Sequence, residues 1–99
     1  MFLNEKIEKI NNYLSKKPVE RAFLFGSYAR SEQNNNSDID ILLEFEKTAK
    51  IGLFQFSRIK LDLENLLSIS VDLLTDEAIS TYIKPFILKD LIKIYEKSN

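Results

Sequence analysis

Residues 23–45, FLFGSYARSEQNNNSDIDILLEF, form the stretch around which the rest of the chain can be interpreted. An apolar run ends at Gly26 and Ser27, a polar loop follows, and a second apolar run carries Asp38 and Asp40. Short apolar runs bounded by turn residues are typical of buried strands. The stretch therefore predicts a strand, a tight turn, a loop and a second strand that begins with two acids.

The two strands are expected at residues 19–25 and 38–45. Between them, residues 32–37 are rich in asparagine, which favours local side-chain-to-backbone hydrogen bonds and hence a loop. Side chains alternate between the two faces of a strand, so Asp38 and Asp40 share one face and the neighbouring isoleucines the other. A short helix is expected at residues 27–31.

The composition limits the possible functions. The 99 residues suffice for one domain, 1–99, and 44% hydrophobic residues suffice for its core. Cysteine and histidine are absent, so disulfides, thiolate ligands and imidazole catalysis are excluded and any metal must bind to oxygen. The net charge of −1 lacks the basic excess of a protein that binds long nucleic acids, which we do not expect as partners.

Membrane association is not expected either. No apolar segment approaches the roughly 20 residues that a membrane-spanning helix needs. The first residues, MFLNE, lack the charged region followed by an apolar region that is typical of a signal peptide. The expected location is the cytoplasm.

Two longer helices are predicted by apolar periodicity, at residues 2–16 and 51–67. Phe54 and Leu61 lie off the apolar stripe of the second helix, which predicts contact with a partner or with the chain's own tail. The expected packing stripes are Leu3, Ile7, Ile10 and Leu14 in the first helix, and Gly52, Phe56, Ile59, Leu63 and Leu66, flanked by Leu53 and Leu67, in the second.

The last third of the chain begins with a third strand at residues 68–75, which carries Asp72 on the face opposite its apolar residues. Separate helical pieces are expected at 76–83 and 84–91, because Pro85 interrupts a continuous helix. Residues 92–96 alternate like an edge strand but also continue a helical stripe, so both remain open. If this tail is helical, Lys89, Lys93 and Lys97 form a basic row. We expect an α/β (α+β) protein with a small mixed sheet flanked by helices.

The central acids suggest metal-assisted chemistry on phosphates. Asp38 and Asp40, roughly 7 Å apart along one strand face, can share magnesium ions, which prefer oxygen ligands and substrate phosphates. A turn at Gly26 and Ser27 can bind phosphate through backbone N–H groups and a hydroxyl, and Arg30 can add positive charge. Each feature alone is more often a simple turn or a solvated acid. Their joint occurrence at this spacing is expected by chance in about one in a thousand chains of this length.

The segment GSYARSEQNNNSDIDILLEF resembles the signature of the minimal nucleotidyltransferase family of the DNA polymerase beta superfamily, in which Gly-Ser precedes Asp-x-Asp in an apolar strand. The resemblance covers essentially the whole chain and implies the palm-like nucleotidyltransferase fold. It assigns phosphate binding to Gly26 and Ser27, metal binding to Asp38 and Asp40, and the third, assisting acid to Asp72. The family commonly has glycine where this chain has Ser31, which requires the backbone there to avoid a glycine-only conformation.

The same resemblance implies an activity and a partner. Similar proteins are often antitoxins paired with a HEPN-domain ribonuclease toxin, and they transfer AMP from ATP to a tyrosine of that toxin with Mg²⁺. The chain has room for catalytic residues but for no acceptor domain, so the acceptor is expected on another molecule. Two other functions remain open: a nucleotidyltransferase with a small-molecule acceptor, and a non-catalytic antitoxin that binds its toxin and neutralises it by occlusion.

Overall fold

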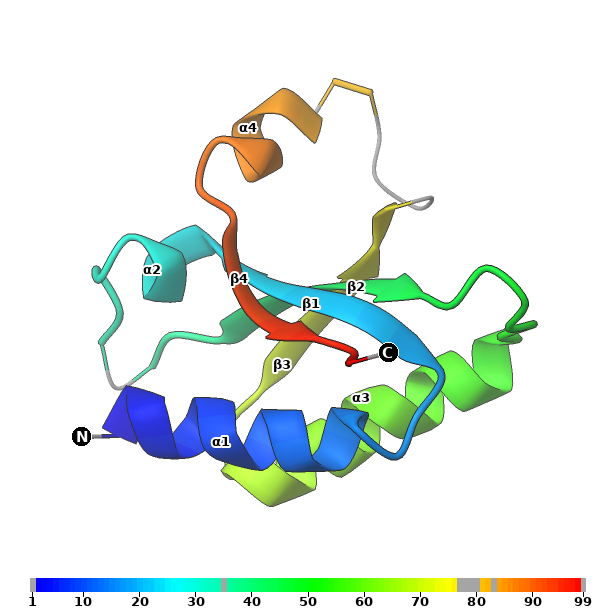
Figure 1. Ribbon diagram of the computed structural model, residues 1–99. Coiled ribbons are helices and arrows are strands. Elements are labelled where there is room, and N and C mark those ends of the chain that lie inside the picture. The colour runs from blue at the N-terminus through cyan, green and yellow to red at the C-terminus, as the bar shows by residue number, and fades with distance from the viewer. Residues whose placement is uncertain (1, 35, 77–80, 83, 99) are drawn as a thin grey trace.

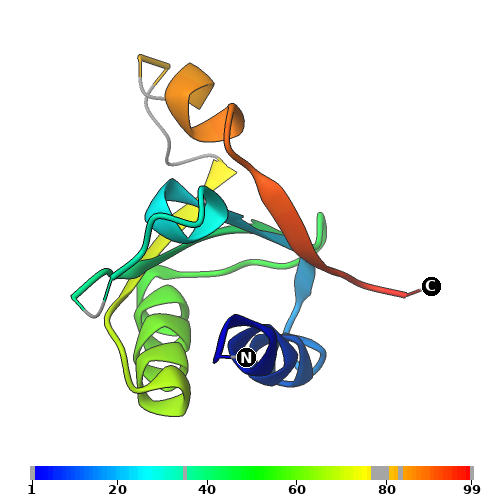
Figure 2. The same ribbon diagram turned by 90° about the vertical axis from the view of Figure 1, so that its left-hand side faces the viewer.

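The computed structural model describes residues 2–34, 36–76, 81–82 and 84–98. The described chain forms one mixed sheet with two long helices on one face (Figures 1 and 2). In chain order the elements are α1 (Phe2–Leu14), β1 (Val19–Phe25), α2 (Gly26–Ala29), β2 (Ile39–Phe45), α3 (Leu53–Leu67), β3 (Val71–Thr75), α4 (Lys84–Leu88) and β4 (Ile92–Glu96).

The sheet has the strand order β3-β2-β1-β4. Strand β1 pairs antiparallel with β2 and β4, whereas β2 and β3 are parallel and are connected through α3. This arrangement confirms the expected small mixed sheet. It also settles residues 92–96 as a strand, because β1 has a free edge that β4 completes. The basic row that a helical tail would have formed is therefore absent, with Lys93 paired to Glu96 and Lys97 to Glu46.

The hydrophobic core lies between the sheet and the helices α1 and α3, which lie on the same side of it (Figure 2). Alternate strand residues face this core, and Ile39, Ile41 and Leu43 of β2 are fully buried. The predicted stripe of α1 is confirmed, with its last two members, Ile10 and Leu14, fully buried. The two helices are also connected by a hydrogen bond of 2.7 Å from the Tyr13 hydroxyl to Asp62.

The predicted stripe of α3 needs two corrections, of which the first is Gly52, an exposed residue that is the N-cap of the helix and not part of its buried row. Ile59, Leu63 and Leu67 are buried, whereas Leu66 is 37% exposed. The spacing of four residues keeps Ile59, Leu63 and Leu67 in one row, while Leu66 lies off that row. Phe54 is 89% exposed. Packing of Phe54 and Leu61 against the tail, one of the two expectations, is therefore not found in the described residues.

The remaining elements follow the sequence patterns with small differences at their ends. The loop before β2 is held by local bonds, including one of 2.8 Å from the Asn36 N–H to the Asn34 side chain. The second predicted helical piece is observed as α4, in which Pro85 occupies the first turn, a position that proline tolerates. Most of the first piece, 76–83, lies outside the described residues. In the part of the chain that the structure describes, no helix is long and apolar enough to cross a membrane.

Candidate active site

Three acids predicted from the sequence lie where β1 ends and where β2 and β3 begin. Asp40 is the register partner of Phe25 in β1 and of Asp72 in β3, so one row across three strands carries both acids. Ile39, Ile41 and Val71 face the core beneath α1 and α3. Asp40 and Asp72, which alternate with them, therefore lie on the opposite face of the sheet. Asp38 is exposed and immediately precedes β2.

The start of β3 is fixed by two hydrogen bonds. Ile39 N–H donates to the Ser70 carbonyl at 3.0 Å, which begins the pairing of β2 with β3. Val71 N–H donates to the Glu64 carboxylate of α3 at 2.9 Å. The helix that crosses between the parallel strands thus also holds the residue just before Asp72. This long-range pairing is what brings Asp72 to the other acids.

Gly26 and Asp40 are packed so closely that only glycine fits. Gly26 has φ of 71°, and a Cβ on it would lie 2.0 Å from Oδ2 of Asp40. Glycine is therefore required here both by its backbone conformation and by the neighbouring carboxylate. The turn leads into α2, where Arg30 N–H donates to the Gly26 carbonyl at 3.2 Å.

Tyr28 anchors this turn in the core, a role that the sequence analysis missed. Its side chain is 9% exposed and belongs to the core cluster, although α2 has only four residues. A four-residue helix is too short to be stable alone, so the buried ring fixes its position against the sheet. An aromatic residue directly after the Gly-Ser turn is the local signal that points to this anchor.

The electrostatics of the acids favour a bound cation. Desolvation by burial, followed by the charges of Asp72 and Asp38, raises the pKa of Asp40 to about 6, and Arg30 opposes this shift. Three neighbouring carboxylates that repel one another are stabilised when a cation binds among them. All donors are oxygen atoms, as Mg²⁺ prefers.

The residues thus fit a magnesium site by chemistry, but they do not form a complete one by themselves. Within the described ranges, no three acidic side chains are grouped closely enough to hold a metal ion. Mg²⁺ usually keeps several waters and takes further ligands from substrate phosphates. An incomplete set of ligands from the protein is therefore what a magnesium site of this kind needs.

Two predicted residues have properties that the sequence did not reveal. Arg30 forms ion pairs with Glu32 at 2.8 Å and with Asp90 at 3.0 Å. Ser31 has φ of 59°, in the left-handed region that L-residues adopt only at a cost. The backbone at residue 31 thus adopts a conformation that favours glycine but is not restricted to it, because serine occupies it.

The sequence of residues 6–94 matches the nucleotidyltransferase domain family. A candidate protein adenylyltransferase of Methanocaldococcus jannaschii is 43% identical over 94 residues, which cover 95% of this chain and 99% of the relative. The protein adenylyltransferase MntA of Thermococcus cleftensis is 31% identical over 96 residues, 89% of this chain and 95% of the relative.

One similar structure contains a partner protein. It is the complex of tri-AMPylated HEPN toxin with MNT antitoxin from Shewanella oneidensis, one chain of which is 19% identical to this chain with a TM-score of 0.72. The aligned region covers 98% of this chain and 74% of that chain, and at this identity the likeness shows the fold. This structural likeness and the family match over residues 6–94 confirm the expected architecture. The chain belongs to the nucleotidyltransferase domain family and is an enzyme of that class.

Proposed function

We propose that this protein transfers AMP from ATP to a hydroxyl group of a HEPN-domain ribonuclease toxin, with a tyrosine as the acceptor and pyrophosphate as the leaving group, and thereby acts as its antitoxin. The observation that carries this proposal is the register of Asp40 with Asp72, beside the Gly26 turn, on the sheet face that α1 and α3 leave open. The relatives named protein adenylyltransferase support AMP as the transferred group and a protein as the acceptor.

The proposed roles follow from the chemistry of each side chain. Asp38 and Asp40 would hold Mg²⁺, with Asp72 as a further ligand or as the base that takes the proton of the attacking hydroxyl. The bound metal would neutralise the triphosphate and favour the deprotonated nucleophile. Gly26 lets the backbone approach a phosphate closely, and Ser27 and Arg30 would donate hydrogen bonds to it.

A HEPN toxin is proposed as the partner for two reasons. The similar Shewanella complex contains such a toxin carrying AMP groups. This chain also exposes large apolar side chains on α3, with Leu53 at 81%, Phe54 at 89% and Leu61 at 54%. Large apolar side chains exposed on one helix make that helix a candidate protein-binding surface. We further propose a cytoplasmic location, where ATP is available, and a single domain spanning 1–99.

The test combines purified chain, Mg²⁺, α-labelled ATP and the product of the neighbouring toxin gene. We expect label on the toxin and loss of its ribonuclease activity, and mass spectrometry after proteolysis should place AMP on a tyrosine. Asp38→Asn with Asp40→Asn should abolish labelling. Toxin neutralisation by this double variant, with no label on any protein, would instead support occlusion. Labelling of a small hydroxyl compound only would support the small-molecule acceptor.

A further inference from the structure

The guanidinium of Arg30 is held between carboxylates from two distant parts of the chain. Nε lies 2.8 Å from Glu32, two residues further on, and Nη1 lies 3.0 Å from Asp90, which stands between α4 and β4. α2 and α4 lie on the same side of the sheet, away from α1 and α3 (Figures 1 and 2). The Asp90 contact thus connects the Gly26 turn to the end of the chain.

Asp90 is the better fixed of the two carboxylates. Its side chain is 24% exposed, compared with 64% for Glu32. Its backbone N–H donates to the Ile87 carbonyl at 3.2 Å, which holds the turn after α4. A less exposed and more constrained carboxylate loses less side-chain entropy when it binds and is screened less by solvent. Asp90 therefore contributes more than Glu32 to fixing the guanidinium.

The two contacts leave part of the guanidinium available. Arginine has five N–H donors, and Nε and one N–H of Nη1 are used by Glu32 and Asp90. Among the described residues, no hydrogen bond or ion pair uses Nη2, so its donors remain for a further acceptor. Arg30 also lies at the Gly26 turn, because its backbone N–H donates to the Gly26 carbonyl at 3.2 Å, so its side chain extends from the candidate phosphate-binding turn.

We propose that Asp90 is a positioning residue that orients the Arg30 guanidinium so that its remaining N–H donors meet a phosphate of the bound nucleotide. This inference rests on the proposed function, because it takes phosphate binding by Arg30 from it. A fixed guanidinium loses less conformational entropy when phosphate binds, and its planar donors suit bidentate contact. Asp90 acts here through Arg30 and does not touch the nucleotide.

The test measures the affinity of the full chain for AMP-PNP with Mg²⁺ by calorimetry. Asp90→Asn should weaken binding about three- to tenfold, and Asp90→Glu should recover part of the loss. In an Arg30→Ala background, Asp90→Asn should have no further effect, because the group that Asp90 orients is gone. A merely structural role of Asp90 would not give this non-additivity. Thermal unfolding of each variant checks that it is folded.

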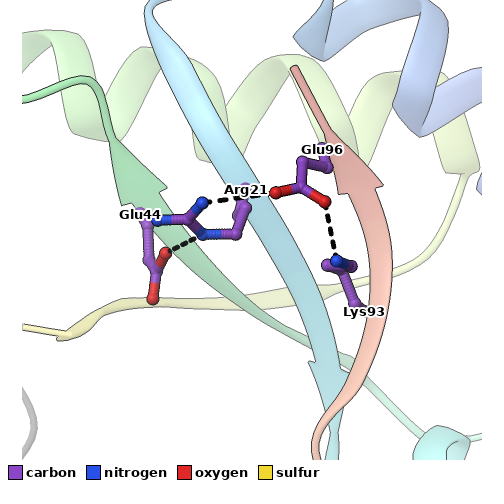
Figure 3. Close-up of polar contacts among 4 residues, drawn as sticks. All are labelled: Arg21, Glu44, Lys93 and Glu96. Atoms are coloured by element: carbon purple, nitrogen blue, oxygen red, sulfur yellow. Dashed lines mark hydrogen bonds and ion pairs between the residues drawn. The ribbon is translucent and has the colours of Figure 1, made fainter. Parts of the chain in front are cut away.

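Glu96→Gln is the matched control. Glu96 accepts from Arg21 at 3.3 Å and from Lys93 at 2.7 Å, in a group of ion pairs across β2, β1 and β4 (Figure 3). The Glu96→Gln substitution removes one carboxylate charge from an ion pair with Arg21, which does not involve Arg30. The affinity for AMP-PNP should therefore be unchanged in this variant.

Three results would overturn the proposal. The affinity of Asp90→Asn for AMP-PNP could be unchanged, or it could be higher, which would show that Asp90 competes with phosphate for Arg30. The third is a loss of affinity in Glu96→Gln equal to that in Asp90→Asn. The measurement is separate from the test of the proposed function. A chain that binds AMP-PNP but labels no protein contradicts AMP transfer, while its binding data still decide the role of Asp90. A chain that does not bind AMP-PNP contradicts both.

Discussion

Gly26 and Asp40 exclude a side chain from the space between them, since a Cβ on Gly26 would lie 2.0 Å from Oδ2 of Asp40. Gly26→Ala must therefore displace the carboxylate and also place alanine at a φ of 71°. We expect the free energy of unfolding to fall by about 2–4 kcal/mol. Urea denaturation measures this change, and AMP transfer should be lost with it.

Gly52→Ala is the control for this prediction, because nothing lies within 4 Å of a Cβ there. Gly52 is the N-cap of α3 with φ of −82°, which alanine can adopt, so the cost should stay below about 1 kcal/mol. Combining Gly26→Ala with Asp40→Ala removes the obstructing carboxylate and should restore part of the stability. A double variant less stable than Gly26→Ala would contradict the packing argument.

The raised pKa of Asp40 predicts a pH dependence of stability. The folded-state pKa of Asp40, about 6, exceeds the ordinary aspartate value of 3.8, so the folded chain binds this proton more tightly than the unfolded chain. The contribution of Asp40 to the free energy of unfolding therefore falls as the pH rises from about 4 to 6 and is at its minimum above that range. Without Mg²⁺, Asp40→Asn should be more stable than the unaltered chain by about 1–2 kcal/mol at pH 8, allowing for solvent screening, and no more stable near pH 4.

Urea titrations between pH 4 and pH 8 measure this difference. Glu8→Gln, at an exposed carboxylate of α1, serves as the matched control and should show little change across the range. Parallel stability curves for Asp40→Asn and the unaltered chain would show that burial and the neighbouring acids do not perturb Asp40.

Ser31 occupies a backbone conformation that costs an L-residue free energy. Its φ of 59° predicts that Ser31→Gly stabilises the chain by about 0.5–1 kcal/mol, after the greater freedom of glycine in the unfolded state is subtracted. Ser68 has φ of 58° at the C-cap of α3, so Ser68→Gly should give a similar gain. Thermal unfolding measures both changes.

Ser31→Ala keeps the unfavourable φ and should give no gain, which makes it the control for the glycine variant. We expect AMP-PNP affinity to change less than about twofold in Ser31→Gly, because serine already holds the turn in this conformation. Destabilisation by glycine at residue 31 would show that the serine side chain itself supports the turn.

Asp72 should matter more for the chemical step than for binding. Asp72→Asn is expected to reduce the rate of AMP transfer by at least about 100-fold and to change AMP-PNP affinity by less than about threefold, as for a base or an assisting ligand. Asp76→Asn is the matched control, since Asp76 follows the far end of the same strand and pairs with Lys84 at 3.5 Å. Equal transfer rates for Asp72→Asn and the unaltered chain would mean that another group fills this role.

Substitutions of two leucines of α3 distinguish the contribution of core packing to stability from that of surface contact to binding. Leu63 is fully buried and Leu61 is 54% exposed. Leu63→Ala should lower the free energy of unfolding by about 2–5 kcal/mol, whereas Leu61→Ala should change it by less than about 0.5 kcal/mol. If α3 binds the toxin, Leu61→Ala should instead weaken complex formation, measured by calorimetry. Equal destabilisation by both changes would contradict the observed orientation of the helix.

The sequence by itself determined the features that depend on neighbouring residues. Apolar periodicity predicted α1 and α3, and turn residues predicted the Gly26 turn and the loop before β2. The alternation in β2 predicted that Asp40 lies on the face away from the core. Such patterns suffice because helices, turns and the faces of a strand are set by steric and hydrogen-bonding preferences over a few residues.

The tertiary structure decided what depends on distant segments. The residues 92–96 fit a helix or a strand until pairing with β1 is known. The orientation of α3 decides that Leu67, at the flank of the predicted stripe, is buried and that Leu66 is not. The register of Asp40 with Asp72 and the contact of Arg30 with Asp90 have no local signature. Pairing between strands and burial against a common core depend on the whole chain, so the acids of the candidate site are brought together only when the sheet forms.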